Sequence, residues 1–206
     1  MFKFYKLLHF VKISFLKVIG SSYAYFYLIL IRADFGRNIF IGKPIIVCSS
    51  PGSIVLGKGN RFASSSIYNP IGINHRCIIS TMTKKAKIII GDNSGFSGTS
   101  IGSFARIEIG SNCKIGANTL ITDSDWHLDD FRSGIPEKII IKDGVWIGVN
   151  CTILKGVTIG ENALIGANSV VTKNIPPNTI AVGNPCEVIK YLNNDWFFIQ
   201  VIYFYI

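Results

Sequence analysis

The sequence predicts an all-β fold in which short parallel strands wind into a triangular β-helix. Isoleucine occupies 36 of the 206 positions and glycine 20, while charged residues make up only 16%. Aliphatic residues also recur at an unbroken spacing of six between Ile141 and Val171. This period fits neither the 3.6 residues of a helical turn nor the alternation of a long strand. It fits a short strand and a corner, repeated three times per coil, with coils stacked about 4.8 Å apart.

The composition excludes several other classes of protein. A chain with 49% hydrophobic residues is not intrinsically disordered. The five cysteines contain no C-x-x-C pair, which argues against a zinc site, and their odd number without a clear export signal indicates reduced thiols. The net charge of +9 comes from scattered basic residues, so we expect no nucleic-acid partner.

Residues 1–35 are predicted to form a helical segment with one apolar face. Six side chains follow the i, i+3, i+4 pattern of a helix: Phe4, Leu7, Leu8, Val11, Phe15 and Val18. Lysines and His9 fall on the broad opposite side. Two interpretations stay open, a cap on the open end of the domain and an interfacial helix on anionic lipid.

The charge pattern of this segment argues against a transmembrane span. The longest uncharged stretch, residues 18–31, has fourteen residues, whereas a spanning helix needs about 20. No A-x-A cleavage site of a signal peptide follows it. We therefore expect a cytoplasmic protein, and peripheral contact with the inner face of the membrane stays open.

Residues 36–185 carry the hexads of the predicted β-helix domain. The inward aliphatic series comprises Ile109, Ile115, Ile121, Ile141, Ile147, Ile153, Ile159, Ile165 and Val171. The small inward residues comprise Cys113, Thr119, Val145, Cys151, Val157, Ala163 and Ser169. Looser copies are predicted at Ile41-Gly42, Leu56-Gly57, Ile71-Gly72, Ile90-Gly91 and Ile101-Gly102. We expect both cysteines of the small series to be core residues rather than catalytic thiols, and glycine or asparagine to occupy the strained backbone at corners.

Two segments carry a resemblance to a known family. They read Val145-Trp-Ile-Gly-Val-Asn-Cys-Thr-Ile-Leu-Lys-Gly-Val-Thr-Ile-Gly and Ile165-Gly-Ala-Asn-Ser-Val-Val-Thr-Lys173, the latter running on to Gly183-Asn-Pro-Cys186. With the hexads, they resemble the hexapeptide-repeat acyltransferases, and most of all the sugar and capsular-polysaccharide O-acetyltransferases. The resemblance implies a left-handed parallel β-helix and a homotrimer with active sites between subunits. It also implies acetyl-coenzyme A as co-substrate, a sugar or polysaccharide acceptor and no metal.

The hexad register breaks between Ile121 and Ile141, and residues 122–140 are predicted to form an extruded loop. A long excursion from a regular scaffold is either disordered or functional. Trp126 and Phe131 favour an ordered loop, because both can pack. We assign Trp126 to the binding of substrate.

His127 is the candidate catalytic residue of this loop. Transfer of an acetyl group to an alcohol requires removal of the hydroxyl proton, and an imidazole suits this step at neutral pH. In the resembling family a histidine on an extended loop has this role. Asp125 or Asp123 either orients the ring or binds sugar hydroxyls, and the sequence does not choose between them.

Two rival interpretations of the loop fit poorly. A calcium loop needs glycine at its sixth position, where Leu128 stands. A zinc hydrolase needs three convergent histidines, but His9, His75 and His127 are far apart in register. His9 and His75 lack a motif and are predicted to be structural.

The resemblance also implies a coenzyme site. Trp146 matches the tryptophan beside the acyl-binding groove, and as the neighbour of an inward isoleucine it should face outward. Positions along the pantetheine arm and toward the nucleotide are matched by Val149, Ala167, Thr172 and Lys173.

The sequence departs from the family pattern in two places. Glu187 stands where relatives often have a basic residue, and Lys190 is the next cation for the coenzyme phosphate. The segment Ser94-Gly-Phe-Ser-Gly-Thr99 replaces the asparagine-containing acceptor segment of the galactoside and maltose enzymes, which leaves Ser97 as a candidate acceptor ligand.

Residues 186–206 form an apolar tail. Its last twelve residues are too few to span a bilayer as a helix. They can pack on the β-helix, pair with another chain or join the first helix at a membrane surface.

The sequence therefore predicts an acetyl-coenzyme A-dependent O-acetyltransferase that acts on a sugar hydroxyl in surface-polysaccharide biosynthesis. Transfer is expected to be direct, without a covalent enzyme intermediate. Two alternatives stay open, N-acetylation of an amino sugar and a non-catalytic β-helix scaffold.

Overall fold

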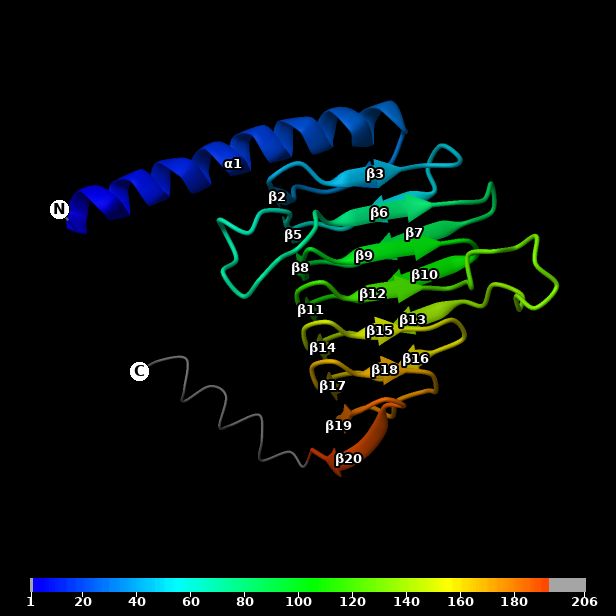
Figure 1. The fold of residues 1–206 in the computed structure, drawn as a ribbon. Helices are drawn as coiled ribbons and strands as arrows, with labels where there is room; N and C mark the ends of the chain where they lie inside the picture. The colour runs from blue at the N-terminus through cyan, green and yellow to red at the C-terminus, as the bar shows by residue number, and fades with distance from the viewer. Residues whose placement is uncertain (1, 193–206) are drawn as a thin grey trace.

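The computed structural model describes residues 2–192 and confirms the left-handed parallel β-helix (Figure 1). Three sheets form the faces of a triangular prism. Sheet A contains β1 (Asp34–Phe35), β4 (Ile54–Leu56), β7 (Lys87–Ile90), β10 (Arg106–Ile109), β13 (Ile139–Ile141) and β16 (Thr158–Ile159). Sheet B contains β2 (Ile39–Ile41), β5 (Arg61–Ala63), β8 (Gly95–Ser97), β11 (Lys114–Ile115), β14 (Trp146–Ile147), β17 (Leu164–Ile165), β19 (Thr179–Val182) and β20 (Glu187–Tyr191). Sheet C contains β3 (Ile45–Val47), β6 (Ile78–Thr81), β9 (Ser100–Ser103), β12 (Leu120–Thr122), β15 (Thr152–Ile153) and β18 (Val170–Val171).

The predicted aliphatic series forms the core of the prism. Parallel pairing places Ile115 beside Ile147, and Ile147 beside Ile165, so that equivalent side chains stack between coils. All nine members of the series are at most 3% exposed. The small residues next to them are buried as well. Because the stacked side chains are in register, every coil buries the apolar surface of the coil before it.

Asparagines and glycines occupy the corners of the coil for different structural reasons. Seven asparagines have left-handed backbone with φ between 53° and 60°, namely Asn93, Asn112, Asn118, Asn150, Asn162, Asn168 and Asn178. Gly42, which follows the inward Ile41, also has left-handed backbone with φ of 83°, but the glycines that follow the inward isoleucines of the later coils have a different function. A Cβ on Gly116 would lie 2.4 Å from the carbonyl group of Gly148 on the next coil. These glycines therefore allow neighbouring coils to approach closely rather than supplying the left-handed turn.

Larger side chains fill the interior of the first coils. Phe40, Phe62 and Phe96 stack along sheet B with ring centroids 4.9 and 4.8 Å apart. A ladder of buried amides supports them, since the backbone N–H of Asn60 donates to Asn38 Oδ1 and that of Ser94 donates to Asn60 Oδ1. This aromatic stack replaces the aliphatic series of the later coils.

Two excursions leave the coil at corners. Residues 123–138 connect β12 to β13 and match the predicted loop. Residues 64–77 connect β5 to β6 and were not predicted. The hexad proposed at Ile71-Gly72 is wrong, because Ile71 is 61% exposed and both residues lie in this excursion. The aliphatic residues of the other four looser copies are buried in the prism, where Ile41, Leu56 and Ile90 end strands and Ile101 lies within β9.

Helix α1 (Phe2–Leu30) covers the open end of the coil, as the cap interpretation predicted (Figure 1). Its buried residues Gly20, Ala24 and Leu28 pack against the first coil. A Cβ on Gly20 would lie 2.5 Å from the carbonyl oxygen of Phe40, so the helix lies directly on the backbone of β2. Tyr25 Oη donates a hydrogen bond of 2.6 Å to the carbonyl oxygen of Asn38.

Helix α1 lies within the predicted helical segment of residues 1–35. It has 29 residues and, within the described part of the chain, is long and apolar enough to cross a membrane by length and composition. The sequence argument against a span counted uncharged residues only, but the helix continues through Lys12 and Lys17. A count of uncharged residues therefore underestimates the length of α1.

The cysteines are free and not disulfide-bonded. Cys113 and Cys151 occupy the small inward positions and are each 1% exposed. Burial raises the pKa of the Cys113 thiol to about 11, and it also raises the pKa of Cys151. Both are thus neutral core residues, as predicted. Of the apolar tail, residues 193–206 lie outside the described part of the chain.

Replacing Gly116 with alanine should destabilise the coil. The new methyl group would overlap the carbonyl group of Gly148, and these backbone atoms cannot move without breaking the ladder between coils. We expect the free energy of unfolding to fall by ~2 kcal/mol or more in thermal denaturation. Gly95→Ala is the matched control, because a Cβ there meets no atom within 4 Å. Equal stability of both variants would contradict the close-approach argument.

Candidate active site

The loop of residues 123–138 is anchored at its first residue by Asp123. This side chain is fully buried, and its carboxylate accepts hydrogen bonds from Phe104 N at 2.6 Å, Ser103 Oγ at 2.7 Å and Ala105 N at 2.9 Å. Glu137 N closes the base of the loop by donating to the carbonyl oxygen of Asp123 at 2.9 Å. Asp123 therefore holds the loop on the preceding coil and does not contact the imidazole of His127.

Trp126 fixes the next part of the loop against sheet C. Its Nε1 donates to Thr122 Oγ1 at 2.9 Å, and its ring meets Phe104 edge-on with the centroids 5.2 Å apart. A Cβ on Gly102 would lie 2.6 Å from the indole ring, so that glycine makes room for it. Trp126 is still 44% exposed. Trp126, which is predicted to bind substrate, therefore also has a structural role in the loop.

Asp125 connects the loop to the following coil. Its carboxylate pairs with the Lys155 ammonium group and accepts a hydrogen bond of 2.9 Å from Gly134 N. The Lys155 hydrogen bond, and next the one from Gly134 N, lower the pKa of Asp125 below its usual value. The carboxylate stays ionised at neutral pH and holds the loop to the following coil.

His127 lies at the exposed turn between these anchors. Its backbone N–H donates to the carbonyl oxygen of Asp125 at 2.9 Å, and its carbonyl oxygen accepts from Asp130 N at 3.1 Å. The side chain is exposed, and within residues 2–192 neither Asp123 nor Asp125 bonds to it. The loop therefore presents an imidazole to solvent on a backbone that is held at both ends.

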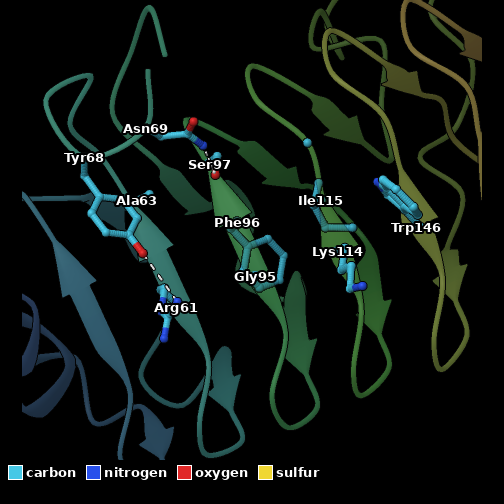
Figure 2. A pocket seen from close by; sticks show the side chains of 11 residues that line it. Arg61, Ala63, Tyr68, Asn69, Gly95, Phe96, Ser97, Lys114, Ile115 and Trp146 are labelled. Atoms are coloured by element: carbon cyan, nitrogen blue, oxygen red, sulfur yellow. Dashed lines mark hydrogen bonds between the residues drawn. The ribbon is translucent and has the colours of Figure 1, made fainter. Parts of the chain in front are cut away.

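A second candidate region lies on the outer face of sheet B (Figure 2). It is a pocket of about 310 Å³ between the excursion 64–77 and Trp146. Ser97 Oγ accepts a hydrogen bond of 3.0 Å from Asn69 Nδ2 at one end. At the other end, Lys114 Nζ lies 5.5 Å from the centroid of the Trp146 ring. Trp146 is 45% exposed, which confirms its outward orientation.

The predicted site residues fall into two groups on different corners of the prism. Val149 and Ala167 lie at the corner between sheets B and C on successive coils, where Asn168 N donates to the carbonyl oxygen of Val149. Ser97 and Trp146 lie on the adjoining sheet B, and Lys190 lies on β20 at the end of that sheet.

The second group lies at the corner between sheets C and A. Thr172 and Lys173 follow β18 there and are exposed. The His127 loop leaves the coil at the same corner, after β12. One chain therefore does not bring all the predicted residues into one place.

Sequence reasoning missed part of the sheet B pocket. Its unpredicted polar members are Arg61, Tyr68, Asn69 and Lys114, and Arg61 hydrogen-bonds the Tyr68 hydroxyl at 3.4 Å. The excursion could have been found by comparing the sequence spacing between equivalent inward residues of different coils. Phe62 and Ile79 correspond to Ile115 and Ile121 on a later coil, yet they stand seventeen positions apart instead of six.

No cluster of three or more histidine, cysteine or acidic residues able to hold a metal ion is present in the described residues. Several acidic residues of the loop are held by other contacts, as in the pairing of Asp125 with Lys155 on the following coil. Asp130 also forms an ion pair with Arg132, which lowers the pKa of that carboxyl group.

Comparison with known proteins matches these coils to hexapeptide-repeat transferases. Residues 138–173 match the family described as bacterial transferase hexapeptide (six repeats), and residues 88–123 match the hexapeptide repeat of succinyl-transferase. The two matched ranges contain Trp146 and Ser97 and flank the His127 loop. The resemblance to hexapeptide-repeat acyltransferases is confirmed.

Individual relatives share less than half of the chain. A protein of Schizosaccharomyces pombe named as an acetyltransferase is 45% identical over 98 residues, which are 44% of this chain and 46% of the relative. The galactoside O-acetyltransferase of Escherichia coli K12 is 42% identical over 92 residues, which are 43% of this chain and 45% of that enzyme. The chain thus spans about half the length of the curated relatives it matches.

A solved structure agrees over most of the chain. AntD, an N-acyltransferase from Bacillus cereus in complex with dTDP and 3-hydroxybutyryl-CoA, superposes with a TM-score of 0.65 at 23% identity. The superposition covers 86% of this chain and 93% of AntD. This similarity supports the β-helix fold.

Replacing Asp123 with alanine should loosen the loop. The change leaves three donors without their acceptor, and hydrogen bonds to a charged group contribute about 1.5–3 kcal/mol each. We expect trypsin to cleave the native protein after Arg132 at least ~10-fold faster than wild type. Asp129→Ala is the control, since its carboxylate is exposed and bonds to no other residue within 2–192. Equal cleavage of both variants would show that Asp123 is not the anchor.

Proposed function

We propose that this hexapeptide-repeat protein transfers an acetyl group from acetyl-coenzyme A to a sugar hydroxyl, with His127 as the general base. The observation that carries the proposal is an ordered loop that presents one exposed imidazole at the corner of a coil. Relatives that match less than half of this chain are named as acetyltransferases. Surface-polysaccharide assembly is the proposed setting, because the sequence resembles capsular-polysaccharide enzymes.

The mechanism needs only a proton acceptor near the attacking oxygen. The neutral imidazole of His127 takes the hydroxyl proton as the sugar oxygen bonds to the thioester carbonyl carbon. The carbon–sulfur bond then breaks, and the leaving thiolate takes the proton from the imidazolium. The anchors at Asp123, Trp126 and Asp125 keep the base at a fixed place on the coil, which reduces the entropy lost when the acceptor binds.

A site between two neighbouring chains accounts for the division of residues over two corners. In this arrangement, the corner with His127, Thr172 and Lys173 of one chain faces sheet B of its neighbour. Trp146 and Ala167 of the neighbour then line the coenzyme groove, while the pocket beside Ser97 receives the acceptor. A closed ring of three such contacts is a homotrimer.

Transfer to oxygen is favoured over transfer to nitrogen by the relatives. The galactoside O-acetyltransferase is 42% identical over its matched region, whereas the N-acyltransferase AntD shares 23% identity and supports the fold alone. An acceptor screen with labelled acetyl-coenzyme A and matched hydroxy and amino sugars, read by mass spectrometry, separates the two reactions. Product from the amino sugars alone would favour N-acetylation.

Replacing His127 with alanine should lower turnover by about 10²–10⁴-fold, because the general base is lost. The melting temperature should not change, since the side chain is exposed. His9→Ala, which changes an exposed histidine on α1, should retain full turnover. Near-normal turnover by the His127 variant would refute its role. If no sugar is acetylated and acetyl-coenzyme A does not raise the melting temperature, the scaffold alternative is favoured.

Mixed oligomers should recover activity from two inactive variants. His127→Ala removes the base, and Ala167→Phe fills the proposed groove at the other corner, so neither variant should turn over alone. After denaturation and refolding together at equal amounts, about a quarter of the sites between chains combine an intact loop with an intact groove. We expect about a quarter of wild-type activity. No recovery, in mixtures shown by mass spectrometry to contain mixed oligomers, would contradict a shared site.

A further inference from the structure

An exposed apolar stripe runs along the whole of α1. At about 100° per residue, one side of the helix collects seven side chains that are 46% to 66% exposed. They are Phe4, Leu8, Val11, Phe15, Val18, Phe26 and Ile29. The stripe is about 38 Å long at 1.5 Å per residue. Isolated apolar residues are common on protein surfaces, but a row of this length, interrupted by Ser22, marks a binding surface.

The stripe faces away from the β-helix. Gly20, Ala24 and Leu28, which pack on the first coil, lie on the opposite side of the helix. Figure 1 shows α1 lying across the end of the prism, with its first half extending beyond the coil. The stripe is therefore the outermost surface at this end, and it suits a flat partner that covers the end of the molecule.

The charges around the stripe select the chemistry of that partner. Residues 1–33 contain no acidic residue, and their cations are Lys3, Lys6, Lys12, Lys17 and Arg32. Lys3 and Lys12 flank the stripe, where long side chains can extend sideways and keep their ammonium groups in water. A row of apolar side chains bordered by cations is typical of helices that lie in the surface of an anionic bilayer.

The packing of α1 is incompatible with a span. Residues 16–30 lie along the first coil, where Gly42 N donates to the carbonyl oxygen of Leu16 and Leu28 is fully buried. A spanning helix needs about 20 residues, so a span within α1 would have to include residues that pack on the coil. The folded protein therefore meets the membrane with the side of the helix.

We propose that α1 is a lipid-docking element, and that its stripe lies flat in the surface of an anionic membrane while the β-helix extends into the aqueous phase. The apolar side chains enter the boundary between headgroups and acyl chains, and Lys3 and Lys12 contact lipid phosphates. This surface is separate from His127 and from the sheet B pocket, so the proposal does not depend on the proposed reaction.

The test compares two double variants of the full chain in vesicle flotation. Phe4→Ser with Phe15→Ser removes two rings from the stripe. Phe2→Ser with Phe10→Ser is the matched control, since it removes two equally exposed rings from the opposite side of the same helix. The probes are vesicles of phosphatidylcholine alone and vesicles that also contain about 30% phosphatidylglycerol.

Wild type should float with the anionic vesicles, not with the neutral ones, and higher salt should weaken its binding. The stripe variant should bind at least ~10-fold more weakly, whereas the control should stay within about threefold of wild type. Equal losses in both variants, or no binding to anionic vesicles, would overturn the proposal. So would resistance to alkaline carbonate extraction, which indicates a span. A change in oligomeric state of the stripe variant without lipid would identify a second chain as the partner instead.

Discussion

The structure depends on the register between coils. Parallel strands about 4.8 Å apart bring equivalent residues of successive coils into direct contact. Each position of a hexad is therefore constrained by its own equivalents, so that isoleucine stacks on isoleucine and the glycine at 116 faces the glycine at 148. A side chain that fits one coil but clashes with the next coil cannot be accommodated in the prism. This constraint explains the low charge of the chain, since an inward charge would be buried on every side.

The register also explains how a loop of sixteen residues is tolerated. Residues 123–138 leave the prism at a corner, and the chain returns to sheet A with Ile139 beside Ile107. Because the strands before and after the loop keep their partners, the loop adds an exposed surface without interrupting the sheets. Its order comes from contacts with the preceding coil. Asp123 satisfies the backbone N–H groups of Phe104 and Ala105, and Trp126 rests on Gly102.

Sequence periodicity predicted the parts of the fold that obey this register. The stacked isoleucines, the small cysteines beside them and the extrusion of the His127 loop all followed from a spacing of six. Features set by contacts between distant residues did not. Gly20 and Ser21 within α1 are one example, because Gly20 is needed where the helix touches the backbone of β2, and Ser21 Oγ accepts a hydrogen bond from Phe40 N. Tertiary contacts here override helix propensity. The excursion at 64–77 was missed because Ile71-Gly72 imitates a hexad.

The constraint on the interior also limits where chemistry can occur. The inward hydroxyl groups of the hexads bond to backbone carbonyl groups, as when Thr119 Oγ1 donates to Gly148 at 3.1 Å and Ser169 Oγ donates to Gly166 at 2.7 Å. The inward thiols are neutral, because burial raises the pKa of Cys113 to about 11. Neither group can act as a nucleophile toward a substrate outside the prism. Reactive groups must therefore lie on excursions or on the outer faces of the sheets. An enzyme built on such a coil is consequently suited to direct transfer between two bound substrates, with a base supplied from a corner loop, rather than to transfer through a covalent intermediate.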